Sequence, residues 1–551
     1  MGKQAGKRRQ DAQALFRRGA GMHGAGQLAP AVAAYRSAVL LAPDHADALN
    51  NLAAALAAMG QHADAAVAWE RLVRLRPGNA DALAGLAAAL LADQRPNEAL
   101  LALAACAGLP PEARLLRLNA RALLAMGLTD PALGALHLAV ALQPDDHAVH
   151  AELTAALLQA RRDGEALLPA LQAFRLAPTA DNAVRLSCVL IGAGHLDAAL
   201  EVTEAGLRAD PACPEAMVNR SVALESLGRV PEAVAAARDA AAAAPANPVM
   251  RHHLGTTLLA AGALTAEAWD LYEARLKLPG VPLLPQARLW DGGPLDGRTL
   301  LIHAEQGLGD TLQFVRYVLL AAARGGRVVL AVQPTLLRLL QGTPGAAEVV
   351  PAGTALPAFD VFVPLLSLPR LFGTTLESVP SPLPYRAPRA PGPMRELWAG
   401  KLRVGLVWAG GSVFADDQHR SMSAVAMDGL AGVPGVHFVS LQLGAAVLPA
   451  GAEDGMAGVQ DFADTAARVA ELDLVIAVDT AVAHLAATMG VPVWLLSRHR
   501  GCWRWGHGQA DSPWYPGLRL FRQSRPGDWD GVVQEVRAAL RAWAEAQAPA
   551  Q

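Results

Sequence analysis

The sequence predicts a two-part protein: an α-solenoid of helical repeats followed by an α/β region. Three observations predict it. Proline recurs at a nearly constant spacing through the first 245 residues, glycine keeps the same spacing, and later short apolar runs alternate with helix-like stretches. The chain has 551 residues, too many for one hydrophobic core, so we expect two or three domains. Hydrophobic residues make up 53% but aromatic residues only 5%, so alanine and leucine dominate and favour helix.

The first half is predicted to be a repeat array. Seven prolines are separated by 34, 34, 33, 34, 33 and 34 residues, and six glycines follow the same period. A fixed period of this length indicates stacked units, each of two helices. Glycine suits the turn between the helices, and proline suits the end of the second helix. The residues are Pro43, Pro77, Pro111, Pro144, Pro178, Pro211 and Pro245, and Gly26, Gly60, Gly127, Gly194, Gly228 and Gly262.

The spacing and the segment "AVAAYRSAVLLAPDHADALNNLAAALAAMG" resemble the tetratricopeptide repeat. The resemblance implies a superhelix over residues 1–275, with seven repeats and a partial eighth that ends near "EAWDLYEARLKLP". The repeat over 147–180 departs from the family pattern at His150, Thr154 and Arg161, where apolar, small and glycine residues are usual. Such superhelices bind extended protein segments on their concave face. A spacer or a platform for oligomerisation is the alternative.

The second half is predicted to hold two Rossmann-like lobes, at about 283–395 and 400–551. Apolar runs such as TLLIHAE, GRVVLAV, FDVFVPL, RVGLVWAG, VHFVSLQ, LDLVIAVD and VPVWLLS are continuous, as in parallel strands buried on both faces. Their alternation with helical stretches predicts doubly wound sheets. Proline-rich segments at 278–297 and 378–394 mark the boundaries.

The segment "HAEQGLGDTLQFVRY" places two glycines and an acid directly after an expected strand. Ligands of open α/β sheets bind beyond the carboxyl ends of strands. Gly307 and Gly309 would let the backbone approach a ligand closely, and Asp310 could accept a proton from an attacking hydroxyl. Helix capping is the alternative role for Asp310.

A second motif, "DLVIAVDTAVAHLAATMG", has a strand that ends at Asp479 and a helix that begins near Thr480. The free N–H groups of a helix start suit a nucleotide phosphate. Thr480 and His484 are four residues apart and therefore share a helical face, where each could bond the phosphate or ribose. Capping by the Asp-Thr pair, with His484 in the core, is the alternative.

A third segment, "SRHRGCWRWGHGQADSPWYPGLRLFRQ", is predicted to be a functional loop rich in arginine and aromatic residues. Arginine forks suit phosphate or carboxylate, and indole faces suit sugars or bases. The aromatic residues could instead anchor a long loop. The possible donor or acceptor contacts are Arg498, Trp503, Arg504, Trp514 and Tyr515.

Together, "HAEQGLGDTLQFVRY", "AVDTAVAHLAA" and "DSPWYPGLRLFRQ" resemble bacterial tetratricopeptide-repeat glycosyltransferases, whose C-terminal domain is related to the lipopolysaccharide heptosyltransferases. The resemblance implies a GT-B fold of two facing lobes and inverting chemistry. It also implies that Asp310 is the base and that Asp479, Thr480 and His484 bind the donor's nucleotide-phosphate portion.

Two departures from the heptosyltransferase pattern concern the donor site. Gln442, Leu443 and Gly444 stand where relatives often have Gln-Lys-Gly, so one cation is missing and Gln442 is the donor contact expected to remain. Between "VWAGG" and "RSMS" the family lysine is absent, and the nearest cations are His419 and Arg420. Arg420 could replace that lysine as a phosphate contact, because its charge is permanent and its fork matches phosphate.

The predicted function is therefore an inverting transfer of a sugar from a nucleotide-activated donor to a protein acceptor recruited by the repeats. Some relatives of this architecture modify flagellin, which makes flagellin or another cell-surface protein a candidate acceptor. The alternative is a non-catalytic repeat scaffold with a degenerate glycosyltransferase domain that mediates protein–protein interaction. A third possibility, a heptosyltransferase with a carbohydrate acceptor, would leave the repeats without a purpose.

Composition argues against several classes of partner and ligand, namely nucleic acid, metal ions and cofactors. The net charge of −3 argues against a general nucleic-acid binder. Cys106, Cys188, Cys213 and Cys502 form no CxxC pair, which predicts neither a zinc site nor a disulfide framework. "ADDQH" and "VQDFAD" do not resemble metal clusters, so we expect no metal and no cofactor besides the nucleotide-sugar substrate.

Without a recognisable signal peptide or membrane span, a cytoplasmic location is expected. The N-terminal bases are interpreted as a solvated tail: Lys3, Lys7, Arg8, Arg9, Arg17 and Arg18.

Overall fold

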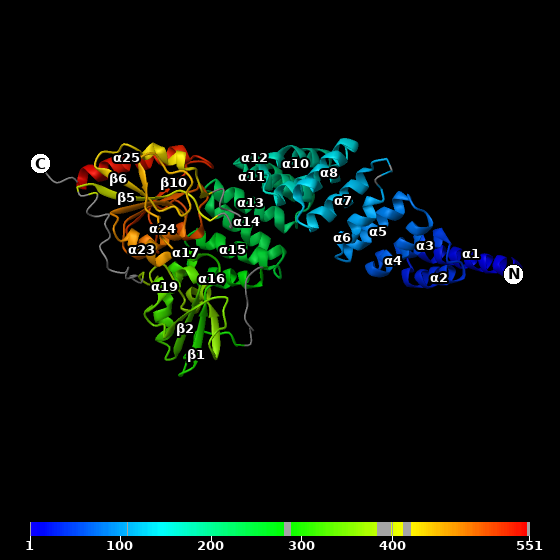
Figure 1. Cartoon of the computed structure of the whole chain (residues 1–551), viewed down its shortest axis with the longest axis horizontal. Helices are drawn as coiled ribbons and strands as arrows, with labels where there is room; N and C mark the ends of the chain where they lie inside the picture. Colours follow the sequence, from blue (N-terminus) through cyan, green and yellow to red (C-terminus); the bar gives the residue numbers. More distant parts are fainter. Residues whose placement is uncertain are drawn as a thin grey trace. The chain divides into compact units, whose positions relative to one another are not determined.

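The computed structural model describes residues 2–106, 108, 110–279, 288–382, 398, 400–411 and 420–547 (Figure 1). The chain forms two compact units. The first is Met1–Ala193 with Arg208–Pro211, and the second is Gly194–Leu207 with Ala212–Gln551. The second unit therefore contains the last repeat helices together with every named strand. The domain boundaries expected at 283 and 395 lie outside the described residues.

The first unit consists of consecutive helices that form pairs joined by short turns. Each proline of the 34-residue period lies within a few residues after the second helix of its pair, except Pro111, which follows α6 at a greater distance because α6 ends earlier. The helices are α1 Gly2–Gly24, α2 Leu28–Leu41, α3 Ala46–Ala58, α4 His62–Leu75, α5 Ala80–Ala92, α6 Pro96–Ala104, α7 Ala113–Ala125, α8 Thr129–Leu142, α9 His147–Gln159, α10 Asp163–Leu176 and α11 Ala180–Gly192.

The second unit continues the helical pattern before its sheets begin. The eighth helix pair is shorter than the others and runs into a 3-10 turn, in agreement with the partial repeat expected there. The elements are α12 Leu196–Ala209, α13 Pro214–Ser226, α14 Val230–Ala243, α15 Pro248–Ala260, α16 Ala266–Tyr272 and η1 Glu273–Lys277.

The turn between the paired helices requires a left-handed backbone. All six predicted glycines have positive φ, between +72° and +82°. In the third and fifth repeats the same place is taken by Gln94 and Arg161, with φ of +61° and +60°. A side chain in this conformation costs roughly 1 kcal/mol relative to glycine. The repeat geometry therefore overrides local preference at these two positions.

The first sheet has four parallel strands in the order β3-β2-β1-β4. The strands are β1 Thr299–His303, β2 Arg327–Val332, β3 Glu348–Pro351 and β4 Val361–Pro364. The helix expected after β1 is interrupted: α17 Leu308–Phe314 passes through the 3-10 turn η3 Val315–Tyr317 into α18 Val318–Ala322. Short helical elements follow β2 and β4, namely η4 Pro334–Leu336, α19 Leu337–Leu340, η5 Leu365–Ser367 and α20 Leu368–Leu371.

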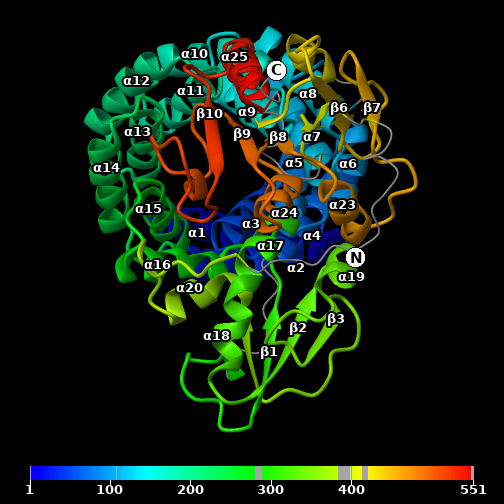
Figure 2. The same ribbon diagram turned by 90° about the vertical axis from the view of Figure 1, so that its left-hand side faces the viewer.

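The second sheet has six parallel strands in the order β10-β9-β8-β5-β6-β7. Figure 2 shows it in yellow to orange-red, with the first sheet in green. Its elements are β5 Leu402–Val407, η6 Ala424–Leu430, β6 Val436–Ser440, β7 Ala452–Asp454, α23 Phe462–Val469, β8 Leu474–Val478, α24 Ala481–Thr488, β9 Val493–Ser497, η7 Trp503–Trp505, β10 Leu518–Arg522 and α25 Trp529–Gln547. The expected loop after β9 therefore ends in a strand.

Both faces of the second sheet are buried, as its continuous apolar strands predict. Leu474 and Ile476 of β8 face a cluster that includes Val536 and Leu540 of α25. Val475 and Ala477, which alternate with them, face the cluster that contains α23 and α24. The structure is thus an α/β region with two parallel sheets, while the GT-B arrangement stays a proposal.

The last repeat helices pack directly on the first sheet. Trp269 of α16 is buried and donates its indole N–H to the carbonyl of Thr374 at 2.8 Å. Arg275 of η1, also buried, bonds Glu305 Oε1 at 2.7 Å and Ser367 Oγ at 2.9 Å. Glu305 follows β1, and Ser367 follows β4. The end of the repeat array therefore fixes two loops at the carboxyl edge of the first sheet.

Candidate functional site

Asp310 lies in the first turn of α17, just beyond β1. Its Oδ2 accepts the backbone N–H of Gly307, the N-cap residue, at 2.8 Å. The capping role considered for Asp310 is thus present, although from the third helical position and not from the cap itself. Its Oδ1 accepts a hydrogen bond from Nη2 of Arg504, which forms an ion pair with it. Both carboxylate oxygens of Asp310 are therefore engaged.

Arg504 comes from η7, in the loop that follows β9. Its side chain is buried, its Nε donates to Gln313 Oε1 at 2.7 Å, and its guanidinium carbon lies 4.5 Å from the centre of the Trp503 ring. Burial by itself would lower the pKa of Arg504, but the negative charge of Asp310 raises it above its ordinary value. Arg504 is consequently a permanent buried cation held against Asp310.

His484 of α24 is the third member of the constellation. A Cβ atom on Gly309 would lie 2.7 Å from Cδ2 of His484, so only glycine allows α17 to approach the imidazole this closely. The Nδ1 atom of His484 and the hydroxyl of Tyr515 are 2.8 Å apart, and Nε2 lies 3.9 Å from Oδ1 of Asp479. The glycine turn after β1 therefore receives a side chain from the second sheet.

The imidazole of His484 is neutral at physiological pH. Burial, and then the positive charges of Arg504, Arg316 and Arg420, lower its pKa to about 3, against an opposing effect of Asp310. Burial also raises the pKa of Tyr515 to about 12, so the phenol keeps its proton. When that phenol donates to Nδ1, the proton of the imidazole sits on Nε2. His484 would then be a neutral hydrogen-bond donor.

Thr480 begins α24 at the carboxyl end of β8, where the sequence predicted a helix start. Its side chain makes no capping bond, and its Oγ1 is buried without a hydrogen-bond partner in the described part of the chain. The first backbone N–H groups of a helix are likewise free to bind an anion. An unpartnered hydroxyl beside them has the donor chemistry that a phosphate requires.

Arg316 follows β1 of the first sheet in sequence and bonds the loop of the second sheet, whereas Arg504 comes from that loop and bonds the helix after β1. It lies in η3, and its Nη1 donates to the carbonyls of Trp514 at 2.8 Å and Pro380 at 3.0 Å. Its guanidinium carbon lies 4.9 Å from the centre of the Tyr515 ring. One buried arginine from each of the two lobes therefore bonds a residue of the other lobe. The motif "TLQFVRY" contains Arg316, but nothing in its spacing indicated this contact.

The aromatic residues of the loop after β9 mostly anchor it. Trp503 and Trp514 are buried and make ring contacts with each other and with Phe314. Trp503 also contacts Trp269 and Tyr272 of the last repeat pair. These positions favour the anchoring role over contact with a sugar. Arg498, at the start of the loop, is half-buried.

A repeat helix holds the same loop from its other side. Glu225 of α13 accepts hydrogen bonds from Arg500 at 3.0 Å and from His507 at 2.8 Å. Burial would raise the pKa of Glu225, but the charges of Arg500 and His507 outweigh it and lower the pKa to about 2. No sequence signal identified Glu225, because its partners lie more than 270 residues away.

The two departures noted in the donor region have different structural outcomes. The Oε1 atom of Gln442 accepts the backbone N–H of Ala409 at 3.0 Å and of Trp408 at 3.3 Å, which fastens the loop after β5. Leu443 is exposed at the surface. Arg420 lies close enough to His484 to lower its pKa. His419 lies outside the described residues.

The repeat helices of the first unit also line a polar groove. It has a volume of about 580 Å³ and combines three arginines of α7 with two acidic residues and an indole. Arg117 bonds Glu152 through two nitrogens, at 2.8 and 2.9 Å. Groove residues from the repeats include Asn50, Trp69, Asp81, Arg114, Arg117, Arg121 and Glu152.

Comparison with known proteins identifies the kind of repeat in the array. A family model of the tetratricopeptide repeat matches residues 24–72 and 184–248. The array contains tetratricopeptide repeats. Protein FlbA of Caulobacter vibrioides is 29% identical over 447 residues, which cover 73% of this chain and 74% of FlbA.

Several solved structures match part of the chain. A tetratricopeptide-repeat protein from Parabacteroides merdae is 12% identical, with a TM-score of 0.37, and covers 45% of this chain and 99% of its own. PilF of Pseudomonas aeruginosa is 20% identical, with a TM-score of 0.32, and covers 38% and 96% respectively. No described helix is both long and apolar enough to cross a membrane.

Proposed function

We propose that the protein is an inverting glycosyltransferase that acts on a protein acceptor recruited by its tetratricopeptide repeats. The observation that carries the proposal is the meeting of Asp310, Arg504 and His484 where the strands of two parallel sheets end. Ligands of open parallel sheets bind at this edge. A carboxylate, a buried cation and a neutral imidazole together supply a base, a countercharge and a donor.

The chemistry follows from the roles of these groups. The hydroxyl oxygen of the acceptor attacks the anomeric carbon of the donor sugar, and its proton passes to Asp310. Each carboxylate oxygen has two lone pairs, so the bonds to Gly307 and Arg504 leave one lone pair on each for this proton. The bond between the anomeric carbon and the phosphate oxygen breaks, and the nucleotide leaves with the electron pair.

The departing phosphate needs positive charge and hydrogen-bond donors. Thr480 Oγ1, the first N–H groups of α24 and Nε2 of His484 supply the donors, and Arg504 and Arg420 supply the charge. Arg504 uses three of its five N–H groups on Asp310, Gln313 and Cys502, which leaves two for the phosphate. The hydroxyl of Tyr515, bonded to Nδ1, orients the imidazole so that Nε2 can donate.

A non-catalytic scaffold is the competing function, and one observation favours it. Both oxygens of Asp310 are already bonded, so the residue has a sufficient structural role as a tie between the two sheets. In that case the repeats alone would carry the function, through binding of a protein partner.

The direct test is a panel of nucleotide sugars, screened first by thermal shift and then by titration calorimetry with the full chain. We expect one nucleotide class to bind and its free diphosphate to compete. Mass spectrometry of a candidate acceptor incubated with that donor should then show the added sugar. Binding of no nucleotide sugar or free nucleoside diphosphate, with the protein folded, would support the scaffold function.

A further inference from the structure

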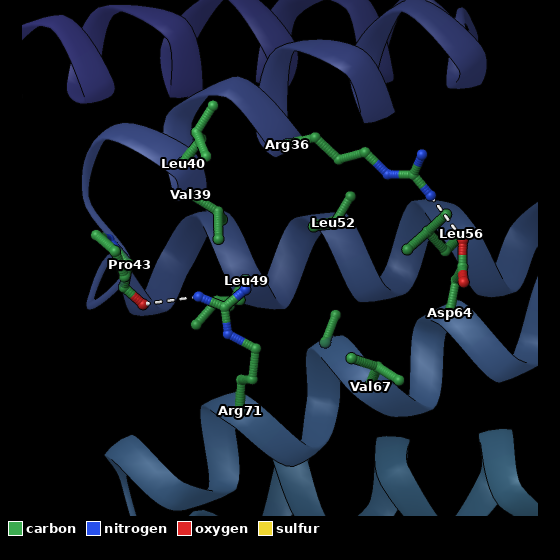
Figure 3. Close-up of a pocket in the computed structure, with 11 residues that line it drawn as sticks. Arg36, Val39, Leu40, Pro43, Leu49, Leu52, Leu56, Asp64, Val67 and Arg71 are labelled. Carbon is green, nitrogen blue, oxygen red and sulfur yellow. Dashed lines mark hydrogen bonds and ion pairs between the residues drawn. The ribbon is translucent and has the colours of Figure 1, made fainter.

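A second cavity lies in the first unit, among α2, α3 and α4, and is separate from the polar groove. It has a volume of about 350 Å³, within the usual range of ligand pockets. Figure 3 shows that α2, α3 and α4 each contribute side chains to it. Its apolar lining consists of Val39, Leu40, Pro43, Leu49, Leu52, Leu56, Val67 and Ala68.

The pocket has a buried floor and exposed walls. Leu49, Leu52 and Leu56 of α3 belong to the core and are at most 6% exposed. Leu40 of α2 is 82% exposed and Val67 of α4 is 57% exposed, so two large apolar side chains stand in solvent on either side of this floor. A partner side chain that entered would cover both walls without any rearrangement of the core.

Charged groups bound the pocket at two places. Arg36 and Asp64 form an ion pair of 2.6 Å between α2 and α4 and neutralise each other (Figure 3). Arg71 reaches the carbonyl of Pro43 through Nη2 at 3.5 Å, a long contact that uses one of its five N–H groups. The guanidinium of Arg71 therefore retains donors for a carboxylate at the pocket's edge.

The combination does not recur in the next repeat. One period of 34 residues further along, Glu70 replaces Arg36, Arg74 replaces Leu40, and Ala105 replaces Arg71. The rest of the apolar lining does recur, as Val73, Pro77, Leu83, Leu86, Leu90, Leu101 and Ala102, and Leu101 is also exposed. What distinguishes this repeat pair is therefore the set of Arg36, Leu40 and Arg71, placed around an apolar lining that the repeat pattern itself supplies.

The surrounding chain is basic. Residues 1–76 contain ten lysine and arginine residues against five aspartate and glutamate residues, whereas the remainder contains 37 against 45. Arg9 of α1 is ion-paired with Asp44, the neighbour of the pocket residue Pro43, so the basic helix α1 extends to the edge of the pocket. A field of this sign attracts and orients acidic partners.

We propose that this pocket, lined by α2, α3 and α4, docks an acidic protein segment that inserts one large apolar side chain beside Arg71. The apolar side chain fills the space between Leu40 and Val67, and a neighbouring carboxylate pairs with Arg71. The rest of the acidic segment follows the basic N-terminal region. This docking is independent of the catalytic activity proposed above.

The test uses the full chain and two labelled dodecapeptides, each with a central Leu-Phe pair. One carries flanking glutamates and the other flanking lysines, and binding is followed by fluorescence anisotropy. We expect saturable binding of the glutamate peptide only. Val67→Ser and Arg71→Glu should each weaken it by about tenfold, since loss of one buried apolar or charged contact at an interface costs on the order of 1–2 kcal/mol.

Two matched variants control for composition and net charge. Leu101→Ser removes an exposed apolar residue at the equivalent place one repeat on, and Arg74→Glu changes an exposed arginine outside the pocket. Both should stay within about twofold of the parent. Equal binding of the two peptides, no saturable binding, or equal losses in the control variants would overturn the proposal. Tighter binding of anionic lipid vesicles or of a short DNA duplex, lost in the same variants, would also overturn it.

Discussion

Arg504 and Asp310 form an ion pair between the loop after β9 and the first helix after β1, across 194 positions of sequence. The same arginine bonds Gln313, one turn further along α17. The pair therefore fixes the second sheet's loop against the helix that carries the candidate base. It also determines how the role of Asp310 can be tested.

Asp310→Asn alone should both reduce sugar transfer and destabilise the second unit. Loss of the proton acceptor would lower transfer by roughly 10²–10⁴. Asparagine would also leave Arg504 without its negative partner, and removal of one member of a buried pair is strongly destabilising. Helix capping, which asparagine can perform, would not protect the fold.

The double variant Asp310→Asn/Arg504→Gln tests whether the instability of Asp310→Asn comes from the unpaired charge of Arg504, because it removes that charge. We expect its melting temperature to recover toward the parent while transfer stays low. Recovery of transfer together with stability would show that Asp310 only ties the sheets and is not the base. Turnover, melting curves and donor titrations on the same preparations decide between these outcomes.

Gly309→Ala should impair the site without removing any functional group. The added Cβ would overlap Cδ2 of His484 at 2.7 Å and push the imidazole away from α17. We expect weaker donor binding, measured by calorimetry, and a lower melting temperature. Gly134→Ala is the matched control, since it lies within helix α8 with no atom near the new Cβ and should stabilise by roughly 0.5–1 kcal/mol. Unchanged donor affinity in Gly309→Ala would remove His484 from the donor site.

Acidification should destabilise the second unit through its buried imidazoles. The pKa of His484 falls from 6.5 to about 3 on folding, so between these values the unfolded chain binds a proton that the folded chain does not. The free energy of unfolding therefore decreases as pH falls from about 6.5 toward 3, by up to roughly 1.4 kcal/mol per pH unit for this group. His252 and His253, each with a pKa lowered to about 4 by burial, act in the same direction.

His484→Gln isolates that contribution, since glutamine does not titrate. Denaturant unfolding between pH 4 and 6.5 should show a shallower loss of stability in this variant than in the parent. His195→Gln, at an exposed position, is the control and should retain the parental slope. An identical slope in His484→Gln would contradict a neutral buried imidazole.

Deletion of residues 1–275 should prevent the rest of the chain from folding. A fragment that begins at 276 lacks Trp269, Tyr272 and Arg275, and so exposes Trp503 and leaves the buried Glu305 without its arginine partner. We expect it to be unfolded or aggregated, as judged by near-UV circular dichroism and light scattering. A fragment that begins at 194 keeps the compact unit and should retain folding and donor binding while losing recruitment by the first repeats. A stable, donor-binding fragment from 276 would contradict this division.

Much of the secondary structure follows from local pattern. The 34-residue beat predicts the helix pairs because each turn needs a left-handed residue and each second helix needs an end, and glycine and proline supply these locally. The strands around Leu301, Leu406 and Ile476 are predictable because burial on both faces requires a continuous apolar run. Thr480 was recognisable as a helix start for the same local reason.

The tertiary structure alone decided which of these elements meet. Arg504 bonds Asp310, Arg500 bonds Glu225, and Arg275 bonds Glu305, across separations from 30 to 275 residues. No periodic pattern in the sequence indicates such pairs. Packing also decided that the last repeats belong with the sheets, and that Gln94 and Arg161 adopt a glycine-like backbone. Sequence by itself determined the helices and strands through short-range sterics and burial. The site arises from long-range contacts, whose free energy is gained only once the whole unit has folded.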